Sequence, residues 1–226
     1  MPRMNQQGEQ NGWTARRWDP AVQERFAKLI GKLGETFDGQ IAGINLQESA
    51  TATTSDIDPG FSEVKFVNGI KSNMKALGEA FPESTTMQYA NFMPGEWLPW
   101  DDKGYLRALY ECGEEIGVGL GAPDLMVHRR AQLNHALAMM HESDFSVPLG
   151  IAIQDGNYIG ETDSHKVVEQ RENIVPLLHA FANQFLKVDY LFRVNQSPYF
   201  EEDVLTCFEL PEAKTASGQQ STLSKN

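Results

Sequence analysis

Cysteine is scarce in this sequence: only Cys112 and Cys207 occur among its 226 residues. Two cysteines without a CxxC spacing do not make a disulfide framework, and no Cys/His cluster indicates a zinc site. The histidines share no metal-ligand spacing with nearby carboxylates, so we expect no bound metal. We expect structural or solvent-exposed roles for all five of them: His128, His135, His141, His165 and His179.

Positive charge is scarce as well. The chain has 19 Lys and Arg against 31 Asp and Glu, a formal net charge of −12, which makes nucleic acid and anionic membranes poor partners. No apolar run approaches the ~20 residues of a membrane span. The first seven residues lack the apolar core of a signal peptide, so the chain as written is expected to be cytoplasmic. The compartment of any longer parent protein is left open.

Apolar stretches typical of buried strands alternate with amphipathic helical patterns. The expected strands lie within 39–49, 86–92, 116–121, 147–153 and 188–194, and the expected helices within 20–34, 63–80, 105–115, 130–140 and 167–185. Such an alternation predicts a parallel sheet with right-handed crossovers. The expected fold class is therefore α/β, a partial (β/α) TIM-type barrel of about five parallel strands with outer helices.

This barrel is expected to span residues 19–210. Residues 1–18 are interpreted as a flexible lead-in, or as a segment that Trp13 and Trp18 hold against a surface. Residues 211–226, rich in Ser, Gln, Lys and Thr, are expected to be disordered.

Small residues recur inside the expected strands, most densely at Gly117, Gly119 and Gly121. Small inward groups suit a crowded barrel interior, or a backbone that a ligand approaches closely. These glycines lack the third glycine of the dinucleotide fingerprint at its usual spacing, so we expect no cofactor.

Polar and aromatic side chains follow every expected strand, although loops are polar in general. Amides and carboxylates bond hydroxyl groups, and Trp or Tyr rings stack on the C–H face of a sugar. Positive groups are sparse there, mainly Arg193, which argues against a phosphorylated substrate. We therefore expect an uncharged carbohydrate as partner, bound by Asn45, Gln47, Gln88, Asn91, Glu96, Trp97, Asp124, Gln154, Asn157, Tyr158, Asn195, Gln196 and Tyr199.

One segment resembles a known family. The run from Asp19-Pro20-Ala21-Val22 through Phe37-Asp38-Gly39 to Gly43-Ile44-Asn45-Leu46-Gln47-Glu48 resembles clan-A glycoside hydrolases, especially family 5-like enzymes. In that family the fourth barrel strand ends in Asn-Glu, with the Glu as general acid/base, and the seventh ends in a nucleophilic Glu. Over residues 13–210, the resemblance implies the C-terminal part of such a barrel, with Glu48 as general acid/base and Asp155 as second carboxylate.

Two positions depart from the family pattern. Gln47 stands where the family has Asn, and Gln154-Asp155 stands where it has the nucleophilic Glu. A retaining glycosidase holds its carboxyl groups ~5–5.5 Å apart and an inverting one ~6.5–9.5 Å apart. The shorter Asp155 would suit the wider spacing, or has no catalytic role, in which case Glu96 and Asp124 are the substitutes.

The family's first three strands have no counterpart upstream of residue 13. We therefore expect a truncated or degenerate glycosidase. Without those strands, inward-facing apolar side chains would lack partners, which predicts self-association or a need for the missing N-terminal half. The side chains concerned are Ile41, Ile44, Val118, Ile151 and Ile153. The alternative function is a non-catalytic carbohydrate-binding barrel remnant, or a subunit that needs a partner.

Overall fold

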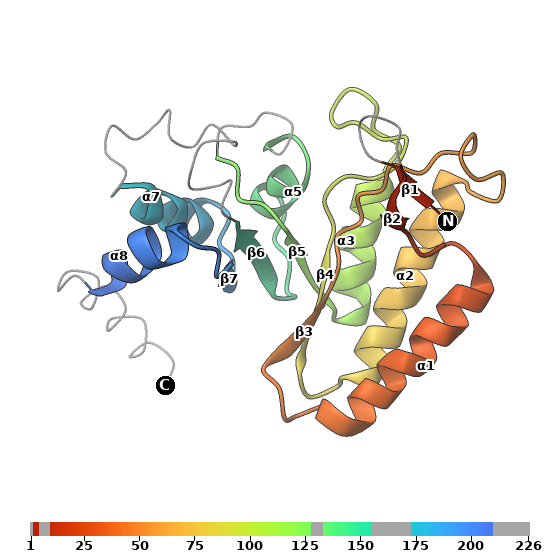
Figure 1. Ribbon diagram of the computed structural model, residues 1–226, viewed down its shortest axis with the longest axis horizontal. Coiled ribbons are helices and arrows are strands. Elements are labelled where there is room, and N and C mark those ends of the chain that lie inside the picture. The colour runs from red at the N-terminus through yellow and green to blue at the C-terminus, as the bar shows by residue number, and fades with distance from the viewer. Residues whose placement is uncertain (1, 5–9, 128–132, 155–172, 210–226) are drawn as a thin grey trace.

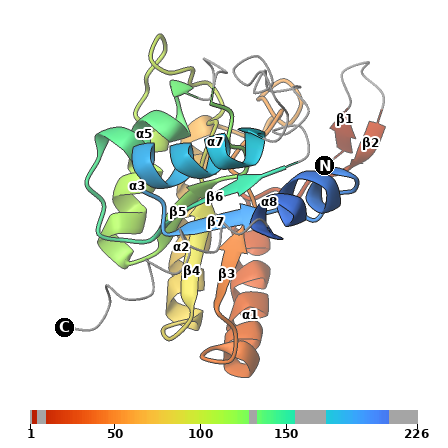
Figure 2. The same cartoon turned by 90° about the vertical axis from the view of Figure 1, so that its left-hand side faces the viewer.

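A computed structural model of the chain describes residues 2–4, 10–127, 133–154 and 173–209. Its central sheet has five strands in the order β3-β4-β5-β6-β7, and every pairing is parallel. The sheet curls into a half-barrel with helices along it, which confirms the predicted partial TIM-type fold (Figure 1, Figure 2). The strands are β3 Gly43–Leu46, β4 Thr85–Tyr89, β5 Gly119–Ala122, β6 Leu149–Ile153 and β7 Tyr190–Arg193.

Helices connect the strands, and α1, α2 and α3 lie side by side along the sheet (Figure 1). They are α1 Pro20–Phe37, α2 Glu63–Ala80, α3 Tyr105–Ile116, α5 Ala136–Glu142, α7 Ile174–Ala180 and α8 Thr206–Glu209. Two π-helical segments, Phe181–Phe185 and Phe200–Leu205, precede β7 and α8 respectively. A short hairpin, β1 Pro2–Met4 with β2 Gln10–Trp13, lies outside the main sheet. The strands of the half-barrel thus alternate with helices, as the sequence pattern predicts.

The first helix begins as predicted but does not end at Gly34. Asp19 caps it by accepting a hydrogen bond from the backbone N–H of Ala21, with Pro20 at the first helical position. Gly34 lies inside the helix, where an added Cβ would collide with the backbone carbonyl of Ala80 at the end of α2. Because glycine allows the two helices to approach this closely, Gly34 serves the contact between them rather than a helix end.

The outer face of the sheet holds the apolar core. Val118 and Ile151 are fully buried in it, and Val118 contacts α2 beside Gly78. Ile153 is equally buried, so the expectation that these three side chains line an uncovered interior is wrong. Strand alternation explains the outcome, because each of these residues points toward the helices while its neighbours point inward.

The inner face of the half-barrel combines small and aromatic side chains. A Cβ at Gly121 would lie 2.7 Å from the Tyr89 ring, and one at Gly150 would lie 3.1 Å from the Phe192 ring. The phenol of Tyr190 on β7 reaches the hydroxyl of Thr85 on β4, at 3.0 Å. Glycines on the central strands therefore leave room for rings that cross the face from either side.

The segment before α1 packs against the rest of the fold at its C-terminal end, through Trp18. Trp18 is only 6% exposed and meets the edge of Phe61 at a ring-centroid distance of 4.9 Å, whereas Trp13 is largely exposed. Trp18 also packs against Phe66. Trp18, but not Trp13, thus holds the lead-in segment against the fold. The predicted tail at 211–226 lies outside the described residues.

None of the helices in the described part of the chain is both long and apolar enough to cross a membrane.

Candidate active site at the carboxyl ends of the strands

Glu48 follows β3 at the carboxyl edge of the sheet, and its side chain is exposed. The Nδ2 group of Asn91, which follows β4, donates to the Glu48 Oε2 atom at 2.6 Å. Asn91 itself is only 1% exposed, and its backbone N–H donates to the Ser49 hydroxyl. Ser49 in turn donates to the carbonyl of Phe92 at 3.1 Å. These hydrogen bonds connect the ends of β3 and β4 and fix one oxygen of the Glu48 carboxylate. The Glu48 side chain nevertheless remains exposed to solvent.

Arg17 holds the same loop from the other side. Its guanidinium donates to the carbonyls of Glu48, at 2.8 Å, and Ala50, at 3.4 Å. It also lies over the ring of Phe66, 4.9 Å from the centroid. Burial lowers the pKa of this guanidinium from its ordinary value, and the neighbouring Glu48 carboxylate partly opposes that shift. The sequence offered no signal for this role, because the partners of Arg17 lie more than thirty positions further along the chain.

Replacing Arg17 with methionine is expected to loosen the Glu48 loop. Two charge-assisted hydrogen bonds are lost, but the desolvation cost of a buried cation is removed too, so we expect a net loss of about 1–2 kcal/mol in stability. Denaturant unfolding measures the stability, and hydrogen exchange at 47–51 measures the loop. Arg25→Met, at an exposed position on α1, is the matched control. Unchanged exchange in Arg17→Met would contradict the role assigned to Arg17.

A second carboxylate–amide pair follows the next two strands. Gln154, after β6, donates from Nε2 to the Asp124 Oδ1 atom at 3.0 Å and to the Pro123 carbonyl at 3.1 Å. Both side chains are half-buried. Asp124 therefore repeats, between β5 and β6, the arrangement that Glu48 has between β3 and β4.

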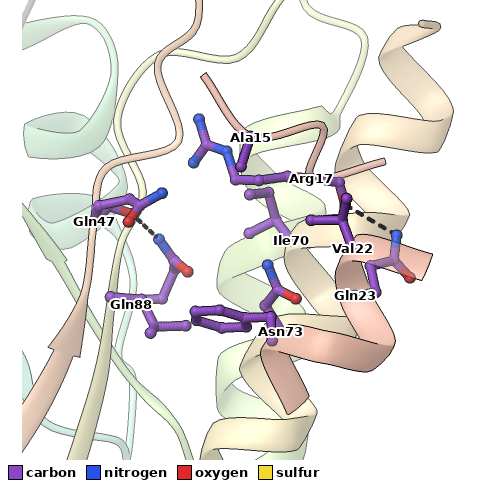
Figure 3. A pocket seen from close by; sticks show the side chains of 10 residues that line it. Ala15, Arg17, Val22, Gln23, Gln47, Ile70, Asn73 and Gln88 are labelled. Carbon is purple, nitrogen blue, oxygen red and sulfur yellow. Dashed lines mark hydrogen bonds between the residues drawn. The ribbon is translucent and has the colours of Figure 1, made fainter. Parts of the chain in front are cut away.

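Two predicted binding residues are engaged elsewhere. Gln88 is buried on the helix side of the sheet, where its Nε2 group donates to the carbonyl of Gln47 (Figure 3) and also to the carbonyl of Tyr89. Glu96 is buried too, and its carboxylate accepts hydrogen bonds from the backbone N–H groups at the start of α3. That helix begins after Gly104, which has no side chain to cap it, so Glu96 supplies the missing acceptor.

Aromatic rings gather beside this edge of the sheet. Trp97 is 46% exposed and stacks on Phe92, with 5.6 Å between the ring centroids. Both rings contact His135, which is fully buried and whose ring nitrogens have no hydrogen-bond partner among the described residues. Sequence reasoning expected a structural role for His135, but nothing in the sequence indicated that it lies against Trp97.

The remaining predicted residues are spread over the site. Asn45 lies on the inner face of β3, beside a cavity of about 190 Å³ that Tyr190 and Phe192 also line. Asn195 is exposed after β7, and Gln47 is exposed after β3, whereas Gln196 and Tyr199 are half-buried. Asp155, Asn157 and Tyr158 lie outside the described residues.

Acid is expected to destabilise the protein through His135. Burial lowers the pKa of this imidazole to about 4, while an unfolded histidine titrates near pH ~6.5. Between these values the unfolded state binds more protons, so the stability that the neutral ring contributes is present above pH ~6.5 and is lost as the pH falls toward 4. Urea unfolding of the parent and of His135→Phe, between pH ~4 and pH ~6.5, measures this loss of stability. The difference between the two must change with pH, and a constant difference would contradict the prediction.

No group of three or more His, Cys, Asp or Glu side chains within the described ranges is arranged to hold a metal ion. Comparison with known proteins found no matching protein family, no matching curated protein and no matching solved structure.

Proposed function

We propose that this chain is a glycoside-hydrolase-like domain that acts on the glycosidic bonds of a carbohydrate, with Glu48 as general acid/base. The observation that carries the proposal is the exposed Glu48 carboxylate, which Asn91 holds at the carboxyl end of a barrel strand. An acid of this kind protonates the leaving oxygen as the glycosidic bond breaks, and in a retaining enzyme it afterwards takes the proton of the attacking water. The hydrogen bond from Asn91 orients the carboxyl group for both steps.

The second carboxylate would come from the neighbouring strand ends. Asp155 follows Gln154, whose side chain already contacts Asp124. Asp124 lies after β5, further along the same edge of the sheet as Glu48. The distance between the Glu48 carboxyl group and its partner would decide whether the sugar's configuration is retained or inverted.

Sugar binding would use the aromatic and amide groups near this edge. Trp97 presents nearly half of its surface to solvent while Phe92 supports its other face, which suits stacking against a sugar ring. The exposed amides of Gln47 and Asn195 would bond hydroxyl groups.

The proposal is tested by incubating the full chain with cellulose, mannan, xylan and chitin oligosaccharides and measuring newly released reducing ends. We expect hydrolysis of one of these classes well above the uncatalysed rate. If none is cleaved while the chain stays folded by circular dichroism, hydrolysis of these substrates is ruled out.

A second candidate, a non-catalytic carbohydrate-binding barrel, has its own support. Glu96 is buried and its carboxylate accepts hydrogen bonds at the start of α3, and Asp124 is half-buried, so neither substitute carboxylate is as exposed as Glu48. Affinity electrophoresis in gels that contain the same polysaccharides separates the candidates, because a binding domain is retarded without cleaving the polymer. Sedimentation of the same sample tests the proposed self-association, which the exposed edge residues Ile41 and Phe192 support.

A further inference from the structure

We propose that the cavity between α1, α2 and the outer face of β3 and β4 is a binding site for a small neutral molecule with an apolar body and an amide or hydroxyl end. This site lies on the helix side of the sheet, whereas the carbohydrate site proposed above lies at the carboxyl edge of the strands. Its occupancy does not depend on whether the chain hydrolyses sugars.

The cavity has a volume of about 180 Å³. Its walls are largely apolar, with Val22 and Phe26 from α1, Leu46 from β3 and Ile70 from α2. A cavity of ~150 Å³ in another protein holds benzene, so this volume is sufficient for a molecule of about six to ten heavy atoms. Apolar walls with a few converging polar groups are typical of small-molecule sites.

Asn73 is the polar side chain that points to a ligand. It is only 8% exposed and faces the cavity from α2 (Figure 3). Within the described part of the chain its amide makes no hydrogen bond. A buried amide is normally bonded, so an occupant that both donates and accepts would satisfy it.

Gln88 lies on the wall opposite Asn73, and its side-chain oxygen is a second group that a ligand could bond. Its Nε2 group is engaged by the carbonyls of Gln47 and Tyr89, both at 2.7 Å, which leaves its Oε1 atom as an acceptor (Figure 3). Gln23 also lines the cavity, and its Nε2 group donates to the carbonyl of Arg17 at 2.9 Å. The amides of Asn73 and Gln88 therefore offer polar contacts from two facing walls of a largely apolar cavity.

Arg17 lines the cavity, but its positive charge does not make the cavity a binding site for an anion. Arg17 directs its guanidinium donors to the carbonyls of Glu48 and Ala50, and the Glu48 carboxylate lies close enough to act on its pKa. An anionic ligand would meet that carboxylate as well as the strongly negative chain. A neutral head group avoids this repulsion and still bonds both amides.

The test is a titration of the uniformly ¹⁵N-labelled full chain with isobutyramide, followed by NMR. We expect saturable shifts of the Asn73 and Gln88 side-chain amides, together with contacts from the ligand methyls to Val22 and Phe26. Isobutyrate, the matched anion, is expected to bind more weakly. Absence of saturable shifts would overturn the site, and tighter binding of isobutyrate would overturn the assignment of a neutral ligand.

Two variants localise the binding. Asn73→Leu keeps a side chain of similar size and removes the amide, and it is expected to weaken isobutyramide binding about five- to tenfold. Asn68→Leu, at an exposed position on the same helix, is expected to leave the affinity unchanged. The dispersion of the amide spectrum establishes that both variants are folded. Equal affinity in the parent and in Asn73→Leu would place the ligand elsewhere and overturn the proposal.

Discussion

Glu48→Gln is expected to lower the rate of oligosaccharide hydrolysis by about 10²–10⁴-fold, the usual contribution of a general acid/base. Glutamine still accepts the hydrogen bond from Asn91, so the loop geometry is preserved while the transferable proton is lost. The loss should depend on the leaving group. A 2,4-dinitrophenyl glycoside needs little protonation to depart, so bond cleavage in that substrate should be affected far less than in a natural oligosaccharide.

Burst kinetics measure the rate of bond cleavage in the dinitrophenyl substrate, and reducing-end assays measure the rate of hydrolysis of the oligosaccharide. Glu79→Gln, at an exposed position on α2, is the matched control and should retain the parent rates. Equal losses on both substrates would indicate that Glu48 acts in some other way than as the acid. A variant as fast as the parent on the oligosaccharide would remove Glu48 from the mechanism.

Gly119→Ala is expected to destabilise the fold by about 3 kcal/mol, at the upper end of overpacking effects. An added Cβ would lie 2.7 Å from the carbonyl oxygen of Pro148 and 2.8 Å from that of Thr86. Both atoms belong to backbone on either side of β5, so no side chain can move away to relieve the contact. For a chain of this size, we expect the melting temperature to fall by about 6–12 °C.

Thermal and urea unfolding measure the stability of Gly119→Ala, and a second variant at Gly31, where an added Cβ has free space, is the control. Gly31 lies within α1, and nothing lies within 4 Å of the position that its Cβ would occupy. Gly31→Ala should therefore stabilise the protein by about 0.5–1 kcal/mol, because alanine is the better helix former. Changes of the same sign and size in the two variants would contradict the close packing at β5.

The order of elements could be predicted from the sequence because it depends on short-range periodicity. The predicted boundaries of α2, at 63 and 80, coincide with the observed ones. The end of α1 was misplaced because Gly34 has two physical readings. A glycine can end a helix or permit a close helix contact, and only the position of Ala80 in space distinguishes them.

The candidate site was predictable only in part. Glu48 and Asn91 were both expected at the carboxyl edge, and the structure brings them into contact. The face on which Gln88 lies depends on strand register, since a shift of one residue moves every side chain to the other side. The capping role of Glu96 could not be predicted, because a loop carboxylate near a Trp looks the same in sequence whether it binds a ligand or caps the next helix.

The contacts of Arg17 and Trp18 have a consequence for synthesis of the chain. Both residues are made before their partners, because Glu48 follows Arg17 by 31 positions and Phe66 is made later still. At ~5–20 residues per second, the apolar stripe of α1, including Ile30, waits about 2–10 s for its partners on α2. During that interval the nascent chain displays an amphipathic helix that cannot yet dock, which makes it a natural target for chaperones that bind at the ribosomal exit.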